Sequence, residues 1–188
     1  VCDFGDDVAL KMPEETLHAV LVMPRVTSHA NIISIHTSEA EKAPGVVKII
    51  TAKDAEAAGC KNVLMAYTFS PRTYVYDQVH KLLQDKKIVN WGNVIAIAVA
   101  DTKAHAEEAA KLVKMEYEQL PEYMSYLEAV LPDAMSIHPG MPNIYCQHPL
   151  RKGAADDVPQ LIEEAAYSVA GSFYSSREPH MSIEGDTV

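Results

Sequence analysis

A strand–helix–strand unit in the middle of the sequence constrains the fold more than any other segment. The run Val94–Ala100 is apolar throughout, which predicts a buried strand. Asp101 predicts the cap of a helix over Thr102–Val113, because small apolar residues recur at helical spacing on one face of that segment. Lys114–Gln119 alternates like a strand and ends before Pro121. A core built from this unit is the firmest structural expectation.

The rest of the chain mixes strands and short helices without a regular βαβ repeat, which predicts an α+β domain. Further strands are expected over Thr16–Met23, around Ile32, Ile33 and Ile35, and over Val46–Ile50, Lys87–Asn90 and Tyr167–Tyr174. Short helices are expected over Glu39–Ala43 with Ser38 and Glu41 as a capping box, from a Thr51 and Asp54 cap to Gly59, and over Gln160–Ala165. Residues 60–85 and 122–160 are expected to be irregular.

Composition bounds the class of protein and its partners. At 188 residues, with 48% apolar and 22% charged residues, the chain has room for one core or for one core with a small appendage. A formal charge of −10 without a run of Lys and Arg argues against nucleic acid as a partner. No apolar run approaches the ~18 residues of a membrane span, so no membrane partner is expected.

The three cysteines, Cys2, Cys60 and Cys146, are far apart and odd in number. That usage suits free thiols in a reducing compartment, and we expect a cytoplasmic protein. It also excludes an iron–sulfur cluster ligated by cysteines of this chain alone.

The residues that carry chemistry in other proteins form no recognisable motif here. The eight histidines show no i, i+4 pair and no neighbouring Cys or acid at metal-ligand spacing. Neither a Gly-x-Ser-x-Gly elbow nor a glycine-rich phosphate loop occurs. Glu107 and Glu108 share a helix face with lysines and predict a solvated surface, and the tyrosines of residues 60–85 are expected to pack that loop down. We therefore predict no catalytic, cofactor-binding or metal-binding residue in this chain.

The order of three segments nevertheless resembles the xanthine oxidase family of molybdenum hydroxylases, most of all the bacterial aldehyde oxidoreductases. The segment "SHANIISIHTSEAEKAPGVVKIITAKD" is similar to the family pattern S-x-H-A-x-I-x-x-I-D-x-S-x-A-x-x-x-P-G-V, with His36 where that pattern has an acid. The segment "WGNVIAIAVADTKAHAEEAAKLVKMEYEQLP" resembles a second pattern, in which Asn93 replaces the usual acid and Trp91 the usual aromatic neighbour. The ending "SSREPHMSIEGDTV" resembles Q-x-H-x-x-(M/I)-E-P at His180, Ile183 and Glu184, while Gly185 replaces the proline.

The resemblance implies an α/β-hammerhead fold, a mixed sheet with short helices. It implies that residues 1–165 are the hammerhead domain and that residues 166–188 are the first strand and loop of a following, truncated molybdopterin-binding domain. His180 and Glu184 lie nearest the family's active-site half, where a structural, hydrogen-bonded role is expected for both. An exposed apolar surface is expected around Tyr167–Val188.

The implied function is that of a scaffold fragment, inactive alone, of an aldehyde oxidoreductase that makes carboxylic acids with oxygen from water. The full-length enzyme would use molybdopterin-bound molybdenum and two [2Fe–2S] clusters, with no cofactor held by this fragment. Its partners would be the remaining molybdopterin-binding domains and an iron–sulfur domain or subunit, and the enzyme would be a homo-oligomer. Two alternatives stay open: the same domain of a xanthine or N-heterocycle dehydrogenase, and a free-standing binding module that shares the fold.

Overall fold

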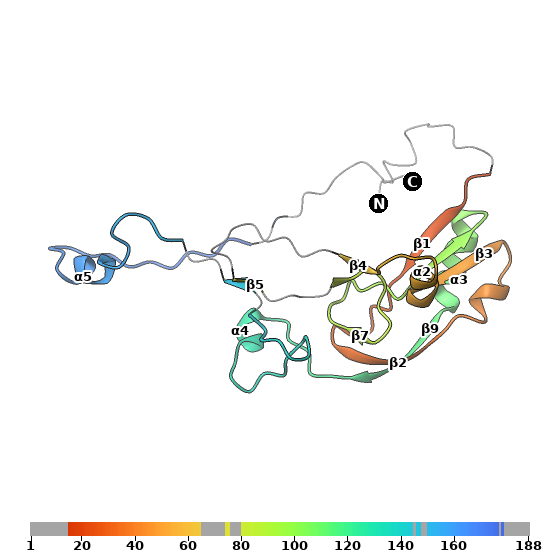
Figure 1. Cartoon of the computed structure of the whole chain (residues 1–188), viewed down its shortest axis with the longest axis horizontal. Helices are drawn as coiled ribbons and strands as arrows, with labels where there is room; N and C mark the ends of the chain where they lie inside the picture. The colour runs from red at the N-terminus through yellow and green to blue at the C-terminus, as the bar shows by residue number, and fades with distance from the viewer. Residues whose placement is uncertain are drawn as a thin grey trace. The chain divides into compact units, whose positions relative to one another are not determined.

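The structure is a computed structural model that describes residues 15–64, 74–75, 80–144, 146–147, 150–176 and 178. Its described residues belong to two units. The larger unit spans Glu15–Pro149, and the described part of the smaller one begins at Leu150. Each is described by itself (Figure 1).

The larger unit contains ten short strands and four helices among its described residues. The strands are β1 (His18–Val22), β2 (Ala30–His36), β3 (Val46–Thr51), β4 (Val63–Leu64), β5 (Tyr74–Val75), β6 (His80–Lys81), β7 (Lys87–Ile88), β8 (Ala96–Ala100), β9 (Lys114–Gln119) and β10 (Cys146–Gln147). The helices are the 3₁₀ turn η1 (Ala40–Lys42) and α2 (Ala52–Ala57), α3 (Lys103–Leu112) and α4 (Tyr126–Ala129). None of the described helices is long and apolar enough to cross a membrane.

The core forms where α3 packs on a three-stranded antiparallel sheet of order β1-β8-β3. The central strand β8 alternates buried and half-buried residues, and its alanines are fully buried. Ala106 and Ala109 of α3 are also fully buried, because small side chains let the helix backbone lie close to the sheet. The strand predicted within Val94–Ala100 and the helix predicted over Thr102–Val113 are thus confirmed as β8 and α3 of this core, while the strand over Lys114–Gln119 is β9 of the second sheet.

A second antiparallel sheet has the order β7-β2-β9, and two-stranded ladders join β4 to β6 and β5 to β10. Both larger sheets contain a β-bulge. The register shifts between Ile32 and Ser34 in β2, and between Val46 and Lys48 in β3. The residues at these shifts, Ile33 and Val47, are 67% and 58% exposed. A bulge adds one residue to one strand, so these apolar side chains leave the alternation that buries their neighbours.

The cap predicted at Thr51 and Asp54 is confirmed at the start of α2. Asp54 Oδ2 accepts hydrogen bonds from Thr51 N at 2.9 Å and from Thr51 Oγ1 at 2.6 Å. Lys48 Nζ lies 3.0 Å from Asp54 Oδ1. The side-chain hydrogen bond from Thr51, then its backbone N–H, and then Lys48 lower the pKa of Asp54 to about 2.

Two predicted helix caps were wrong. Ser38 makes no capping box: Glu41 N donates to Thr37 O at 2.9 Å, Thr37 Oγ1 donates to Glu41 Oε1 at 2.6 Å, and the helix is only the 3₁₀ turn η1. Asp101 is not the cap of α3, because Thr102 has the extended backbone of an N-cap and its Oγ1 accepts from His105 N at 3.2 Å. Asp101 instead binds the imidazole of His105 at 2.6 Å. At α3 the hydroxyl of Thr102 accepts a backbone N–H of the first turn, whereas at η1 the backbone carbonyl of Thr37 does so.

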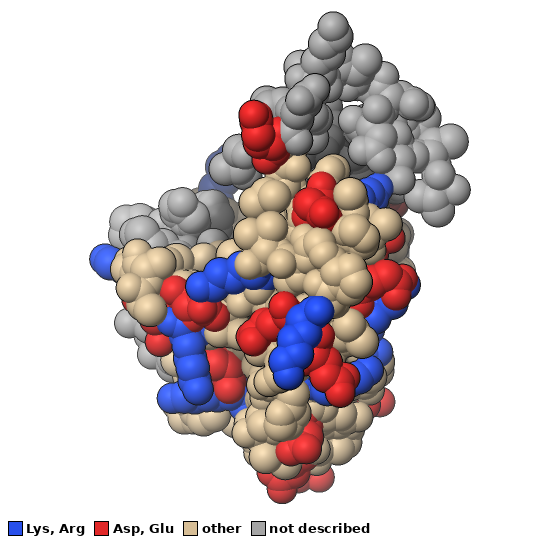
Figure 2. Space-filling model, turned by 90° about the vertical axis from the view of Figure 1, so that its right-hand side faces the viewer, with Lys and Arg blue, Asp and Glu red and all other residues tan. Residues whose placement is uncertain are grey.

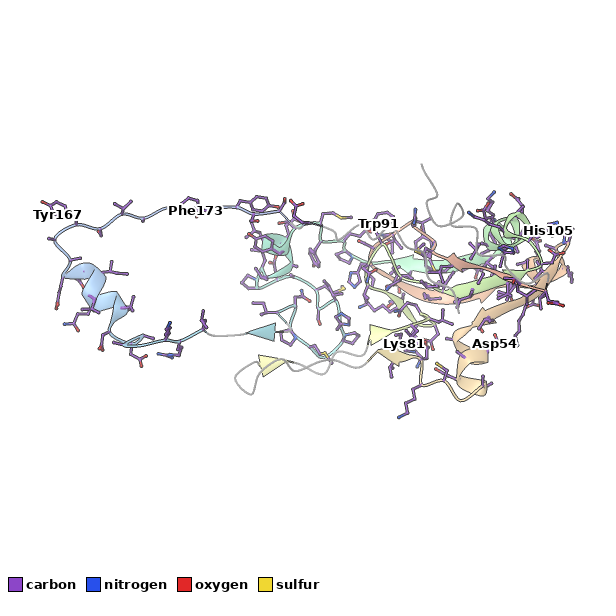
Figure 3. All side chains as sticks on the ribbon, turned by 90° about the horizontal axis from the view of Figure 1, so that it is seen from above. Asp54, Lys81, Trp91, His105, Tyr167 and Phe173 are labelled. Atoms are coloured by element: carbon purple, nitrogen blue, oxygen red, sulfur yellow. The ribbon has the colours of Figure 1, made fainter. Side chains whose placement is uncertain are left out.

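The described part of the smaller unit contains one helix, α5 (Val158–Glu163), which begins two residues before the predicted helix. The strand predicted over Tyr167–Tyr174 was wrong, because the structure assigns these residues to no strand. Figure 3 shows Tyr167 and Phe173 projecting from an extended stretch of chain. Their side chains are 94% and 98% exposed, as expected for apolar residues without a packing partner.

Candidate functional site

A cluster of polar side chains lies where the chain enters β2 beside the end of β9, with Thr27 and His29 buried and Glu122 at the surface. Glu122 Oε1 accepts from Ser28 N at 2.5 Å, from Ser28 Oγ at 2.8 Å and from Thr27 Oγ1 at 3.1 Å. Gln119 Nε2 donates to Thr27 Oγ1 at 2.9 Å. The backbone hydrogen bond from Ser28, followed by its hydroxyl, lowers the pKa of Glu122. The carboxylate therefore fastens two segments that lie far apart in the sequence.

His29 is the buried imidazole of this cluster and is 3% exposed. Its Nδ1 lies 2.5 Å from the carbonyl oxygen of Pro121. Because a carbonyl oxygen only accepts, Nδ1 is the donor. Among the described residues, His29 Nε2 is the buried side-chain atom without a hydrogen-bond partner. The spacing of the histidines in the sequence gives no sign of this unpartnered ring nitrogen.

A second group of polar side chains lies on the exposed surface of the β2–β9 ladder. Ser34 Oγ is 2.9 Å from His36 Nε2 and donates to Glu116 Oε2 at 2.9 Å, while His36 Nε2 is 3.5 Å from Glu116 Oε1. A serine–histidine–acid triad needs the acid on the other ring nitrogen, where it orients the imidazole. Here the glutamate faces the same nitrogen as the serine. This trio therefore lacks the geometry of nucleophilic catalysis.

Asn93 lies where the family pattern has an acid, and its side-chain oxygen accepts hydrogen bonds as a carboxylate would. Its Oδ1 accepts from Val89 N at 2.7 Å and from Asn90 N at 3.2 Å. Asn90 Oδ1 accepts in turn from Gly92 N at 2.8 Å. The amide oxygen thus closes the turn before β8.

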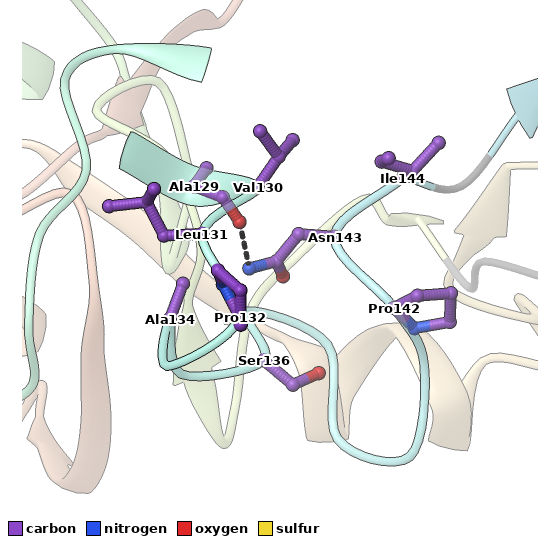
Figure 4. Close-up of a pocket in the computed structure, with 9 residues that line it drawn as sticks. All are labelled: Ala129, Val130, Leu131, Pro132, Ala134, Ser136, Pro142, Asn143 and Ile144. Carbon is purple, nitrogen blue, oxygen red and sulfur yellow. Dashed lines mark hydrogen bonds between the residues drawn. The ribbon is translucent and has the colours of Figure 1, made fainter. Parts of the chain in front are cut away.

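One hollow on the surface has no charged side chain that could hold the phosphate of a molybdenum cofactor. The pocket in Figure 4 has a volume of about 360 Å³, and Asn143 Nδ2 crosses its floor to Ala129 O at 2.7 Å. It is lined by Ala129, Val130, Leu131, Pro132, Ala134, Ser136, Pro142, Asn143 and Ile144, none of which carries a charge. Within the part of the chain that the structure describes, no three His, Cys, Asp or Glu side chains come together as metal ligands.

The structure places only some of the other singled-out residues. The α3 surface is charged as expected, with Lys111 Nζ donating to Glu108 Oε1 at 2.6 Å, and Figure 2 shows acidic and basic side chains interspersed. Cys60 is an exposed free thiol. Residues outside the described ranges include Cys2, Tyr67, Tyr76, His180, Ile183, Glu184 and Gly185. The prediction that the chain carries no catalytic residue stays a prediction.

The class defined by these elements is an α+β domain of two small antiparallel sheets with a helix packed on one of them, in agreement with the predicted hammerhead. The sequence pattern described as "Aldehyde oxidase and xanthine dehydrogenase, a/b hammerhead domain" matches residues 5–121. The chain belongs to this family.

Individual relatives agree with that assignment. An aldehyde oxidoreductase of Megalodesulfovibrio gigas is 42% identical over 184 residues, which cover 98% of this chain and 20% of that protein. A solved aldehyde oxidoreductase from Desulfovibrio gigas superposes with a TM-score of 0.82, at 42% identity, over 96% of this chain and 19% of that one. A xanthine dehydrogenase molybdenum-binding subunit of Escherichia coli O157:H7 is 30% identical over 85% of this chain and 20% of its own length. The chain thus spans about a fifth of these relatives.

Proposed function

We propose that this chain is the hammerhead portion of a molybdenum-dependent aldehyde oxidoreductase and acts as scaffold. The observation that carries the proposal is the 42% identity over 184 residues to an aldehyde oxidoreductase about five times as long. In the longer protein that would contain this chain, an aldehyde and one water give a carboxylic acid, two protons and two electrons. Two [2Fe–2S] clusters would carry these electrons away from the molybdenum. Molybdopterin-bound molybdenum supplies the oxidation when bound, and the protein around it positions the substrate.

The scaffold role follows from the chemistry of the described residues. Their polar side chains join segments of the fold, as Glu122 joins the start of β2 to the end of β9. Among the described residues, the His, Cys, Asp and Glu side chains form no group of three that could hold a metal ion. We therefore expect the chain to be inactive alone, and we expect it to work in the cytoplasm within a homo-oligomeric enzyme. It would contact the remaining molybdopterin-binding domains and an iron–sulfur domain or subunit.

The proposed division puts the hammerhead domain at residues 1–165 and the start of the molybdopterin-binding domain at residues 166–188. Two observations support it. Helix α5 ends at Glu163, and the alternating residues that follow it are almost fully exposed. Apolar side chains of that kind normally have a partner in the intact protein.

Reading the natural gene across both ends of the segment tests the proposal. We expect the reading frame to continue for several hundred codons past Val188, and cysteine-rich sequence to precede Val1 or to be encoded as a separate subunit. A stop codon directly after Val188, with no gene for a molybdenum-binding partner, would contradict the proposal and favour a free-standing binding module.

The scaffold role has its own test in the longer protein. A core substitution such as Ala109→Leu should lower the melting temperature while aldehyde oxidation per bound molybdenum stays unchanged. The matched surface substitution His36→Ala should change neither quantity. Loss of activity per molybdenum in His36→Ala at an unchanged melting temperature would show a catalytic role for this domain.

A xanthine or N-heterocycle dehydrogenase is the second candidate, because xanthine dehydrogenase 2 of Arabidopsis thaliana is 33% identical over 151 residues. The two candidates differ in substrate. We expect the longer protein to oxidise aliphatic and aromatic aldehydes with a much higher kcat/KM than hypoxanthine. The reverse order would assign the chain to the heterocycle enzymes.

A further inference from the structure

A hollow lined by lysines, here called the lysine pocket, lies beside β7 and has a volume of about 340 Å³. Lys81, Lys86 and Lys87 all line it, and Asp85 is the one acid among its described lining residues. The lining therefore has an excess of positive charge, although the whole chain has a formal net charge of −10. The pocket in Figure 4 has no charged side chain by comparison. The lysine pocket is thus a local basic site on an acidic protein.

The ammonium of Lys87 is held at the wall of this pocket. Its Nζ donates to the carbonyl oxygen of Ile137 at 2.6 Å, and the next residue, His138, also lines the pocket. Burial lowers the pKa of Lys87. That direction is expected when an ammonium loses water without gaining a counter-charge. Because an ammonium has three N–H donors, two remain after the bond to Ile137, and an anion beside them would offset the loss of water.

The acid of the pocket already has a partner. Asp85 Oδ1 accepts from Lys81 Nζ, and both side chains are 26% exposed. Lys86 is exposed, and its side chain forms no hydrogen bond or ion pair with a described residue. Lys86 and Lys87 are therefore the two cations of the lining that lack a counter-charge within the described ranges.

Two asparagines at the turn before β8 add hydrogen-bond donors to the lining. Asn93 Oδ1 accepts from Val89 N and from Asn90 N. Asn90 Oδ1 accepts from Gly92 N. The backbone thus uses both side-chain oxygens, whereas neither Nδ2 group binds an acceptor among the described residues. An amide held in this way offers its N–H donors to a ligand, which favours an anion that accepts hydrogen bonds.

We propose that the lysine pocket binds a small oxyanion of the charge and size of phosphate. Lys86 and Lys87 supply the positive charge, and the side-chain amides of Asn90 and Asn93 donate hydrogen bonds to the oxygens of the anion. Hydrogen bonds between charged groups of this kind are stronger than those between neutral groups. One water needs only ~10–15 Å³ of such a hollow, so there is room for a phosphate group. The proposal does not rest on the oxidoreductase function, because it is tested without aldehyde or cofactor.

Inorganic phosphate is the probe, titrated into the full ¹⁵N-labelled chain of 188 residues at constant pH and at an ionic strength held constant with sodium chloride. We expect saturable shifts of the backbone N–H resonances of Lys87 and Gly92 and of the side-chain amide of Asn93. Lys87→Met should weaken phosphate binding roughly 10-fold, because it removes a charged hydrogen bond. Lys61→Met is the matched control, since it removes the same charge from an exposed lysine after α2 and should leave the affinity unchanged.

Three results would overturn the proposal. The first is the absence of shifts at these residues in millimolar phosphate. The second is a set of shifts that do not saturate or that sodium chloride alone reproduces, which would show an adventitious ion only. The third is an equal loss of affinity in Lys87→Met and Lys61→Met, because net charge would then account for the binding. If Lys87→Met fails to fold, the exposed Lys86→Met decides, and it must weaken binding at least about threefold more than Lys61→Met.

Discussion

Gly45 is the position where one methyl group should do the most damage to this fold. The residue follows Pro44 at the start of β3 and has a φ of +72°, in the left-handed region. A Cβ at this position would overlap His105 Nδ1 and Asp101 Oδ1 and would lie 2.8 Å from Asp101 Cγ. The backbone cannot easily move away, because Asp101 N donates to Gly45 O at 3.0 Å.

The magnitude for Gly45→Ala follows from two contributions. A left-handed conformation costs a non-glycine residue roughly 1–2 kcal/mol. Displacing the solvent-exposed Asp101–His105 pair adds a further, smaller loss. The expected loss is about 1–3 kcal/mol in the free energy of unfolding, or roughly 2–12 °C in melting temperature for a chain of this size.

Gly59→Ala is the matched control. Gly59 also has a positive φ, +84°, but a Cβ there would meet nothing within 4 Å. Urea unfolding followed by circular dichroism should therefore show a smaller loss, roughly 1–2 kcal/mol. His105→Ala in the Gly45→Ala background should restore part of the stability by removing one of the overlapping groups. If Gly45→Ala destabilises no more than Gly59→Ala, the close approach of α3 to this turn is refuted.

Three further predictions concern a helix cap, the core and a carboxylate. Asp54→Asn should lower the free energy of unfolding by about 1 kcal/mol at neutral pH. The pKa of Asp54 is about 2 in the folded chain against an ordinary 3.8. The difference in unfolding free energy between the two proteins, measured by urea melts, should therefore be full above about pH 4 and should disappear as the pH falls to 2. Ala109→Leu should cost about 1–3 kcal/mol by overpacking, whereas Ala104→Leu on the exposed face of α3 should be near neutral; equal melting temperatures would contradict the packing. Ser28→Ala should raise the pKa of Glu122 toward its usual value but not fully, since the backbone donor remains; a ¹³C titration that finds no change would refute the carboxylate's role.

The sequence predicted those parts of the fold that depend on local periodicity. The apolar run of β8 predicts a buried strand, and the alanines of α3 recur at helical spacing. Both elements lie where the sequence predicted them. Competition between neighbouring hydroxyls is harder to predict. Ser38 and Thr37 both suit the start of η1, and the choice depends on which backbone reaches Glu41 N. At α3 the choice is instead between two side chains, and the Thr102 hydroxyl accepts the His105 N–H while the Asp101 carboxylate binds the His105 ring.

Properties that depend on distant contacts could not be predicted. Tyr167–Tyr174 alternates like a strand, yet a strand also needs a hydrogen-bonding neighbour, and alternation does not supply one. The bulge in β2 turns Ile33 outward although its residue type predicts burial. The unpartnered Nε2 of His29 results from the meeting of β2 with Pro121, 92 residues away, which no local motif encodes.

The central claim is that this chain is scaffold within a molybdenum-dependent aldehyde oxidoreductase. Aldehyde oxidation in ¹⁸O-labelled water tests it most directly, with the protein expressed from the whole natural gene compared with the 188-residue chain alone. The account predicts that the longer protein, loaded with molybdenum, forms labelled carboxylic acid and that the chain alone forms none. Labelled acid from the purified chain alone, or a longer protein that binds no molybdenum, would contradict it.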